Sequence, residues 1–125
     1  MGHHILVVDD DEGIVEVIQI VLEGEGYIVR TATNKNDLLD LASNLPDLIL
    51  LDVLLSGDDG RDICKSLKSD QATRHIPVIM LSAHSDASKV ADAGGADDFL
   101  EKPFDVDALI DTVARHLSPS QRVHI

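Results

Sequence analysis

Residues that could carry out chemistry follow four apolar runs of the sequence. Three aspartates, at 9–11, come directly after "HILVV", and Asp52 closes the run "DLILLD". Ser82 follows "PVIML", and Lys102 follows "DDFLE". Carboxylates, a hydroxyl and an ammonium group, if brought together, could bind a divalent cation and act on a phosphoryl group. This chemistry requires that the four runs end close to one another.

Asp52 needs a positive partner because the residues around it are apolar. Residues 48–51 before it and 53–55 after it are all apolar, and an ionised carboxylate in such surroundings is costly unless it is compensated. Acids brought together also repel one another, which raises the pKa of carboxyl groups by roughly 1 to 3 units. We therefore predict a hard cation held by carboxylates, a backbone carbonyl and waters: Mg²⁺, with Mn²⁺ as an alternative. Lys102 supplies a second positive charge.

These groups suit phosphoryl transfer to the protein itself. Asp52 would attack phosphorus as the nucleophile and form an acyl phosphate. The cation and Lys102 would share the charge on the phosphoryl oxygens, and the Ser82 hydroxyl would donate a hydrogen bond to one of them. No internal base is needed, because an ionised carboxylate has no proton to lose. No organic cofactor is predicted.

Strands and helices alternate in the sequence pattern. Short β-branched or leucine-rich runs predict strands at 4–9, 27–32, 47–52, 77–82 and 97–102. The alternation predicts an α/β fold of the (βα)5 type, a doubly wound five-stranded parallel sheet. Arg30 and Thr31 place the second strand at an edge, which fits the flavodoxin-like order 2-1-3-4-5. The carboxyl ends of parallel strands share one edge of the sheet, so the polar residues above should meet there.

The intervening segments have the apolar spacing of amphipathic helices. The expected buried faces comprise Ile14, Val17, Ile18 and Val21; Leu38, Leu41 and Ala42; Ile63 and Leu67; and Val106, Leu109, Ile110, Val113 and Leu117. A weaker pattern predicts another helix at 86–93. Asp11 is interpreted as the N-cap of the first helix, and Cys64 as a core residue.

Composition restricts the classes of partner. The 125 residues fit one domain, and 23 acidic against 10 basic residues give a net charge of -13, which disfavours direct contact with nucleic acid. A single cysteine excludes an internal disulfide and cysteine-type zinc spacing. No apolar run is long enough for a membrane span. The first apolar run ends in the aspartates at 9–11, which is too close to the N-terminus for a signal peptide. We expect a cytoplasmic protein with no membrane association.

Four blocks, in order, resemble the receiver domain of two-component response regulators, the CheY-like superfamily. The blocks are "ILVVDDDE", "PDLILLDVLLSGDDG", "IPVIMLSA" and "GADDFLEKPF". The resemblance covers nearly the whole chain and implies a receiver domain at 1–118, followed by a short tail at 119–125. Two features depart from the family pattern: Ser56 stands where proline is frequent, and the span from Ser82 to Lys102 is slightly short. These departures concern the output surface rather than the acidic residues.

The resemblance also implies a role for each site residue. Asp52 would be the phosphoacceptor, Asp10 and the Leu54 backbone carbonyl would join it on Mg²⁺, and Asp9 would assist through water. Lys102 would contact the phosphoryl group and form a cis peptide bond with Pro103. Ser82 and Phe99 would form a switch, although packing in the core is an alternative for Phe99.

The function expected from these roles is a phosphorylation-dependent signalling receiver. It would take a phosphoryl group from a histidine kinase or a His-containing phosphotransfer protein and present a changed face, built by the fourth helix, fifth strand and fifth helix, to a downstream protein. Catalysis would be limited to its own phosphorylation and dephosphorylation. The alternatives are a constitutive interaction module with a vestigial acid site, a flavodoxin-like cofactor binder, and a hydrolase of external phosphoesters. Three aspartates after the first strand disfavour the cofactor binder, because they would repel its phosphate.

Overall fold

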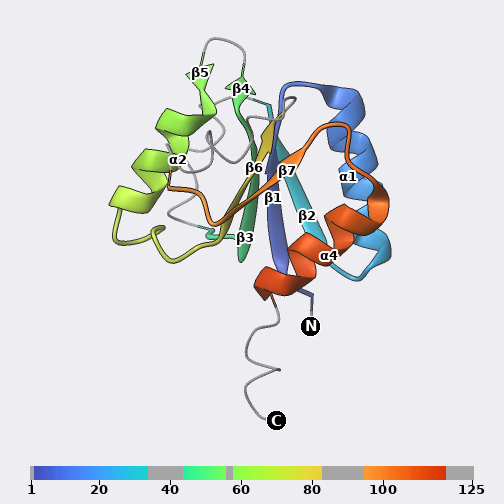
Figure 1. Cartoon of the computed structure of the whole chain (residues 1–125). Coiled ribbons are helices and arrows are strands. Elements are labelled where there is room, and N and C mark those ends of the chain that lie inside the picture. The colour runs from blue at the N-terminus through green and yellow to red at the C-terminus, as the bar shows by residue number, and fades with distance from the viewer. Residues whose placement is uncertain (1, 34–43, 56–57, 83–94, 118–125) are drawn as a thin grey trace.

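The computed structural model describes residues 2–33, 44–55, 58–82 and 95–117, and shows helices on both sides of a central sheet (Figure 1). Its strands are β1 (His4–Val8), β2 (Ile28–Ala32), β3 (Leu48–Asp52), β4 (Leu54–Leu55), β5 (Asp58–Asp59), β6 (Val78–Ser82) and β7 (Asp98–Glu101). Its helices are α1 (Glu12–Gly24), α2 (Gly60–Ser69) and α4 (Val106–Leu117). The helices expected at 38–42 and 86–93 lie outside the described residues.

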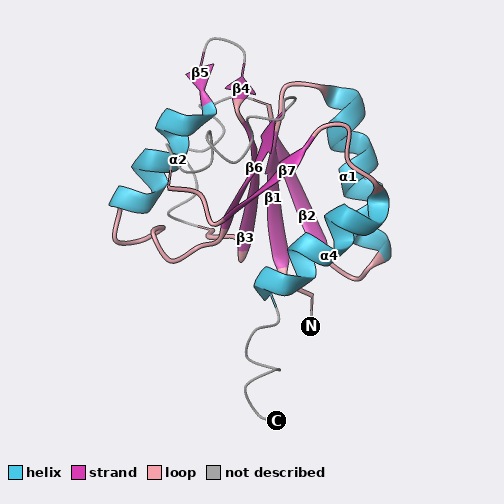
Figure 2. Ribbon diagram, in the orientation of Figure 1, coloured by secondary structure: helices cyan, strands magenta, loops and turns pink. Residues whose placement is uncertain are grey.

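The main sheet confirms the predicted topology. Five parallel strands lie in the order β2-β1-β3-β6-β7, which is the order 2-1-3-4-5 of the five predicted strands (Figure 2). The second strand lies at an edge, as its polar residues indicated. A short antiparallel hairpin, β4–β5, follows β3 and was not predicted. No helix within the described residues combines the length and the apolar character needed to cross a membrane.

Side chains of the sheet alternate between two aliphatic cores. On β1, Leu6 and Val8 pack in the core that includes Ile63, Cys64 and Leu67 of α2. Ile5 and Val7 of β1 pack in the other core, with apolar residues of α1 and α4. All five residues of β3 and of β6 are buried, as expected for central strands covered on both faces. The cores fix the register of the strands, and hence where each strand ends.

The buried face of α1 differs from the predicted one. Val15, Ile18 and Leu22 are buried, whereas Val17 is 53% exposed although it was expected to face the core. The helix carries apolar residues around most of its circumference, so spacing alone could not single out the buried stripe. Asp11 is the N-cap as predicted: its side chain accepts hydrogen bonds from the backbone N–H groups of residues 13 and 14.

An ion pair joins three elements at the edge of the sheet opposite the acidic residues. The Lys68 ammonium, near the end of α2, lies 2.6 Å from the Asp97 carboxylate and donates to the Ile76 carbonyl at 2.8 Å. Asp97 also accepts a hydrogen bond from the backbone N–H of Val78, at the start of β6. Asp97, the residue before β7, therefore connects the start of β7 to α2 and to β6.

Replacing Asp97 should destabilise the fold. An Asp97→Ala variant leaves the Lys68 ammonium without its counter-charge and the Val78 N–H without its acceptor, so we expect a loss of roughly 1–2 kcal/mol in unfolding free energy. Urea unfolding followed by circular dichroism measures the loss. The control is Asp111→Ala, which removes a carboxylate whose side chain is 75% exposed and should change stability by less than about 0.5 kcal/mol. Equal losses in the two variants would contradict the proposed tie.

Candidate functional site

Three carboxylates meet where β1 and β3 end. Asp9, Asp10 and Asp52 each place a carboxylate oxygen within 4.8 Å of the others. β1 and β3 are neighbours in the sheet, which explains why residues 9, 10 and 52 come together. Asp9 is completely buried and Asp52 is 7% exposed, whereas Asp10 is exposed to solvent.

Lys102 brings a positive charge to this cluster from the end of β7. Its ammonium nitrogen donates to Asp9 Oδ2 at 2.9 Å and to Asp52 Oδ1 at 3.1 Å. Its backbone N–H donates to the Ser82 carbonyl at 2.5 Å, which fixes the residue beside the end of β6. The peptide bond between Lys102 and Pro103 is cis, as the resemblance implied. Lys102 is thus the counter-charge that the apolar surroundings of Asp52 require.

The charges of the cluster do not balance. Burial raises the pKa of Asp52, the Asp9 carboxylate raises it further, and the charge and hydrogen bond of Lys102 oppose both. Burial alone would lower the pKa of Lys102, but the hydrogen bonds and charges of Asp9 and Asp52 together raise it above its ordinary value. The lysine therefore stays charged. Three carboxylates against one ammonium leave a surplus of negative charge, and two of the three, Asp9 and Asp52, are buried.

The donor atoms of this cluster fit a hard divalent cation. Carboxylate oxygens are the ligands that Mg²⁺ and Mn²⁺ take in proteins, and a second cation would offset the surplus negative charge. Asp9 already accepts a hydrogen bond on each oxygen, from Lys102 and from the backbone N–H of Asp11. Asp10 and Asp52 are therefore better placed to bind an ion directly, and Asp9 to act through water.

The hairpin register orients the expected carbonyl ligand. The Gly60 N–H donates to the Val53 carbonyl, and Leu54 pairs with Asp59 in the next position of the antiparallel ladder. Bonded and non-bonded pairs alternate in such a ladder, so the Leu54 carbonyl points away from β5. This orientation leaves the carbonyl free of the hairpin and is consistent with the predicted role as a ligand.

Ser82 and Phe99 lie on adjacent strands but in different surroundings. Ser82 ends β6 and is 6% exposed, one position beyond the pairing of Asp52 with Leu81, so it lies at the same edge as the carboxylates. Phe99, on the edge strand β7, is 40% exposed. Packing in the core, the alternative for Phe99, is therefore wrong. Their pairing as a switch stays a prediction.

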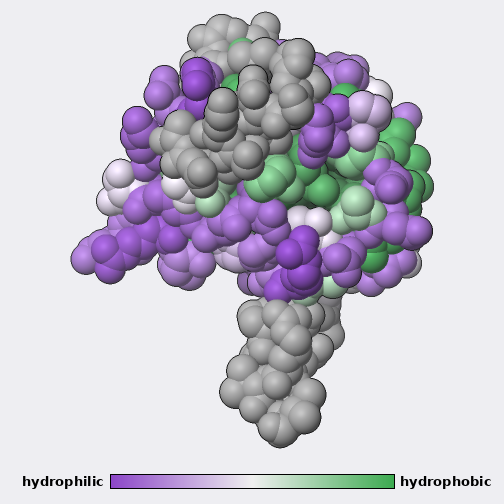
Figure 3. Space-filling view, in the orientation of Figure 1, coloured by the Kyte–Doolittle hydropathy of each residue, from purple (hydrophilic) through white to green (hydrophobic). Residues whose placement is uncertain are grey.

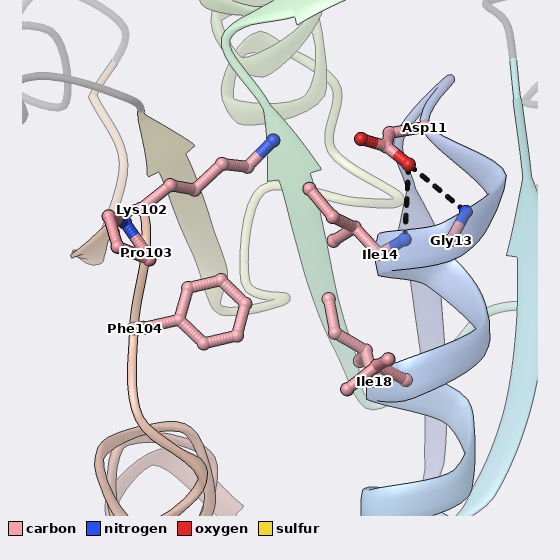
Figure 4. A pocket seen from close by; sticks show the side chains of 8 residues that line it. Asp11, Gly13, Ile14, Ile18, Lys102, Pro103 and Phe104 are labelled. Atoms are coloured by element: carbon pink, nitrogen blue, oxygen red, sulfur yellow. Dashed lines mark hydrogen bonds between the residues drawn. The ribbon is translucent and has the colours of Figure 1, made fainter.

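An apolar cavity adjoins the acidic cluster on its α1 side. It has a volume of about 680 Å³ and lies between α1 and the segment that follows β7, as Figure 4 shows. Ile14, Val17 and Ile18 line one wall, and Pro103 and Phe104 line the other. The Lys102 side chain is also part of the lining, so one residue borders both the cavity and the carboxylates.

The surface around the cavity is also apolar. Figure 3 shows hydrophobic surface over α1 and beside it, bordered by hydrophilic residues. Val17 and Ile20 of α1 are 53% and 65% exposed. The sequence pattern did not reveal this feature, because it placed Val17 in the core. The signal that could have indicated it is the number of apolar residues on α1: Val17 and Ile20, one helical turn apart, exceed what one buried stripe requires.

Comparisons with known proteins agree on one family. A family model described as the response regulator receiver domain matches residues 5–114. The response regulator PleD of Caulobacter vibrioides is 44% identical over an alignment of 109 residues, and the match covers 84% of this chain and 24% of PleD. The chain thus spans about a quarter of the length of this curated relative.

Solved structures give the same result. A response regulator from Chloroflexus aurantiacus J-10-fl has 38% sequence identity and a TM-score of 0.89, covering 94% of this chain and 99% of that chain. The signal receiver domain of a signal transduction histidine kinase from Syntrophus aciditrophicus has 36% identity and a TM-score of 0.85, covering 94% of this chain and 91% of that chain. Both similarities extend over nearly the whole chain.

Removing the Asp52 charge should stabilise the metal-free protein. The raised pKa of Asp52 means that its ionisation disfavours the folded state. The protonated side chain therefore favours folding below its ordinary pKa of 3.8, and this stabilisation is lost as the pH rises through the raised pKa of the folded protein. We expect Asp52→Asn to be more stable than the wild type by roughly 1 kcal/mol at pH 8 without metal. The difference should narrow as the pH falls toward the ordinary pKa of 3.8, and on addition of Mg²⁺.

Thermal unfolding from about pH 4 to pH 8, with and without Mg²⁺, measures this difference. Asp111→Asn removes an exposed carboxylate and should show neither the pH dependence nor the metal dependence. An Asp52→Asn protein less stable than the wild type at pH 8 would show that Asp52 stabilises the metal-free fold, contrary to this account.

Proposed function

The chain belongs to the receiver domain family of response regulators in two-component signalling, and on this basis we propose that it accepts a phosphoryl group on Asp52. The donor would be a histidine kinase or a His-containing phosphotransfer protein. One observation carries the proposal: a lysine ammonium lies between two buried carboxylates, 2.9 Å from Asp9 and 3.1 Å from Asp52, in a cluster that also includes Asp10. This arrangement suits a charged nucleophile and an anionic phosphoryl group.

The side chains of the cluster have separate tasks in the transfer. An Asp52 oxygen attacks phosphorus while the bond from phosphorus to the donor's imidazole nitrogen breaks, and the bonding electrons leave with the imidazole. About 10% of the Asp52 side chain is exposed, which gives the donor access to it. Lys102 then contacts a phosphoryl oxygen in place of the carboxylate oxygen that it holds in the free protein. Mg²⁺, held by Asp10, Asp52 and the Leu54 carbonyl, would neutralise phosphoryl charge.

The output would arise from residues next to the cluster. Ser82 would donate a hydrogen bond to the phosphoryl group and move toward it, and Phe99 would enter the space that Ser82 leaves. Burying a phenylalanine that is now 40% exposed would stabilise the phosphorylated form through the hydrophobic effect. The changed face would comprise β7, α4 and the predicted helix at 86–93, and would bind a downstream protein.

The main alternative is a constitutive interaction module with a vestigial acid site. A vestigial site has no reason to keep three clustered carboxylates, of which one lysine contacts two, because the surplus charge destabilises the fold. The proposed receiver needs this surplus to bind a cation. Its chemistry is limited to its own phosphorylation and dephosphorylation.

Phosphorylation with a small donor tests the role of Asp52. With acetyl phosphate and Mg²⁺, the wild type should gain one phosphoryl group by intact-protein mass spectrometry, and Asp52→Asn should gain none. Asp10→Asn and removal of Mg²⁺ by a chelator should each slow the reaction by roughly 100-fold, because both remove charge stabilisation at the phosphoryl group. Asp111→Asn is the matched surface control. Equal modification of the wild type and Asp52→Asn would refute the assignment.

The apolar surface next to Lys102 is the proposed docking site for the phosphoryl donor protein. A donor histidine must approach Asp52, and the cavity shares Lys102 with the acidic cluster, so a protein seated there lies beside the nucleophile. Val17 and Ile20 are exposed on the same helix and would be covered by the donor. Exposed apolar residues next to a polar site are typical of protein interfaces.

Acidic substitutions on α1 should separate docking from chemistry. Val17→Glu and Ile20→Glu should slow phosphotransfer roughly tenfold or more from a histidine phosphotransfer protein that phosphorylates the wild type. Their reaction with acetyl phosphate should stay unchanged, because neither residue belongs to the acidic cluster. Glu16→Gln is the control on an exposed position of the same helix. Unchanged transfer from the donor protein would exclude this face as the docking site.

A further inference from the structure

Gly60 lies against the backbone of the proposed phosphoacceptor. It is the first residue of α2 and is buried. A Cβ atom at this position would lie 2.1 Å from the Asp52 carbonyl oxygen and 2.9 Å from the Val53 Cα. Both distances are far shorter than any van der Waals contact, and both neighbouring atoms belong to the backbone, so neither can rotate away. Only glycine fits here unless the chain around Asp52 moves.

The requirement for glycine at this position is one of space. Among the described glycines, those with positive φ are Gly26 and Gly95, so the backbone of Gly60 is in a region that other residues also adopt. The limit is therefore the closeness of two chain segments, as in other sites where backbones approach each other.

Hydrogen bonds hold the segment after Asp52 from two sides. The Gly60 N–H donates to the Val53 carbonyl at 2.6 Å, and the Val53 N–H donates to the Leu81 carbonyl of β6 at 3.0 Å. Val53 is thus fixed between α2 and the central sheet. A side chain at position 60 would push on the Asp52 carbonyl while β6 retains Val53, so the displacement would fall on Asp52 itself.

We propose that Gly60 is a positioning residue that sets the place of the Asp52 carboxylate and of the Leu54 carbonyl for binding a cation and a phosphoryl group. The inference rests on the proposed function of Asp52. The Asp52 carboxylate lies 3.1 Å from the Lys102 ammonium and within 4.8 Å of an oxygen of Asp9 and of Asp10. A displacement of the chain at Asp52 would disturb these distances. A misplacement of about 1 Å at a reacting group can slow a reaction by roughly 100-fold.

A Gly60→Ala variant tests this role. We expect Mg²⁺ affinity, measured by calorimetry, and the rate of phosphorylation by acetyl phosphate each to fall roughly 10- to 100-fold. Gly24→Ala is the matched control, because a Cβ there meets nothing within 4 Å. It should leave both measurements unchanged. Wild-type Mg²⁺ affinity and wild-type phosphorylation in Gly60→Ala would overturn the proposal.

A second variant separates positioning from loss of stability. Ile63→Ala removes a buried side chain from the same helix and should lower stability, but it adds no atom at position 60 beside the Asp52 carbonyl. At equal unfolding free energy, adjusted with trimethylamine N-oxide where needed, Gly60→Ala should bind Mg²⁺ more weakly than Ile63→Ala. Equal affinities would mean that Gly60 acts only through stability, and would overturn the proposal.

The proposed function and the role of Gly60 can fail separately. If the wild type is not phosphorylated, the function of Asp52 is refuted, yet the Mg²⁺ affinities still decide whether Gly60 positions the cluster. If the wild type is phosphorylated and Gly60→Ala matches it, only the role of Gly60 is refuted.

Discussion

The contact of the Lys102 ammonium with the Asp9 and Asp52 carboxylates is the interaction on which the site depends. It joins residues far apart in the sequence, from the ends of β1, β3 and β7, at one edge of the sheet. β6 separates β3 from β7, so the lysine must reach across the end of β6 to meet the acids. The contact therefore requires the whole strand order, and a change in the register of β7 would remove it.

This site is kept at some expense in stability. Burial and the neighbouring Asp9 raise the pKa of Asp52, so holding it ionised disfavours folding, and a single lysine does not balance three acids. The two aliphatic cores offset this cost, since β3 and β6 are buried along their whole length. A rigid sheet carries the charges, and a bound cation would complete the balance.

The sequence predicted the strands and the meeting of the polar residues because both follow from local pattern and topology. Continuous apolar runs identified the central strands, and parallel strand ends determined where Asp52 and Lys102 would lie. The buried face of α1 was not predictable, because the helix carries apolar residues around most of its circumference, including the exposed Val17. The β4–β5 hairpin and the need for glycine at position 60 depend on the approach of two backbone segments, and no spacing of residue types encodes such a distance.

The surroundings of the three acids distinguish their chemical abilities. Asp9 is fully buried and accepts a hydrogen bond on each carboxylate oxygen, so neither oxygen can approach a phosphorus atom without losing a partner. Asp10 is exposed, and hydration competes with any attack that it could make. Asp52 is shielded from most water, and one of its oxygens accepts a hydrogen bond from Lys102. About a tenth of its side chain is exposed, so an incoming group can reach it. A nucleophile needs both desolvation and access, and of these three carboxylates only Asp52 combines them.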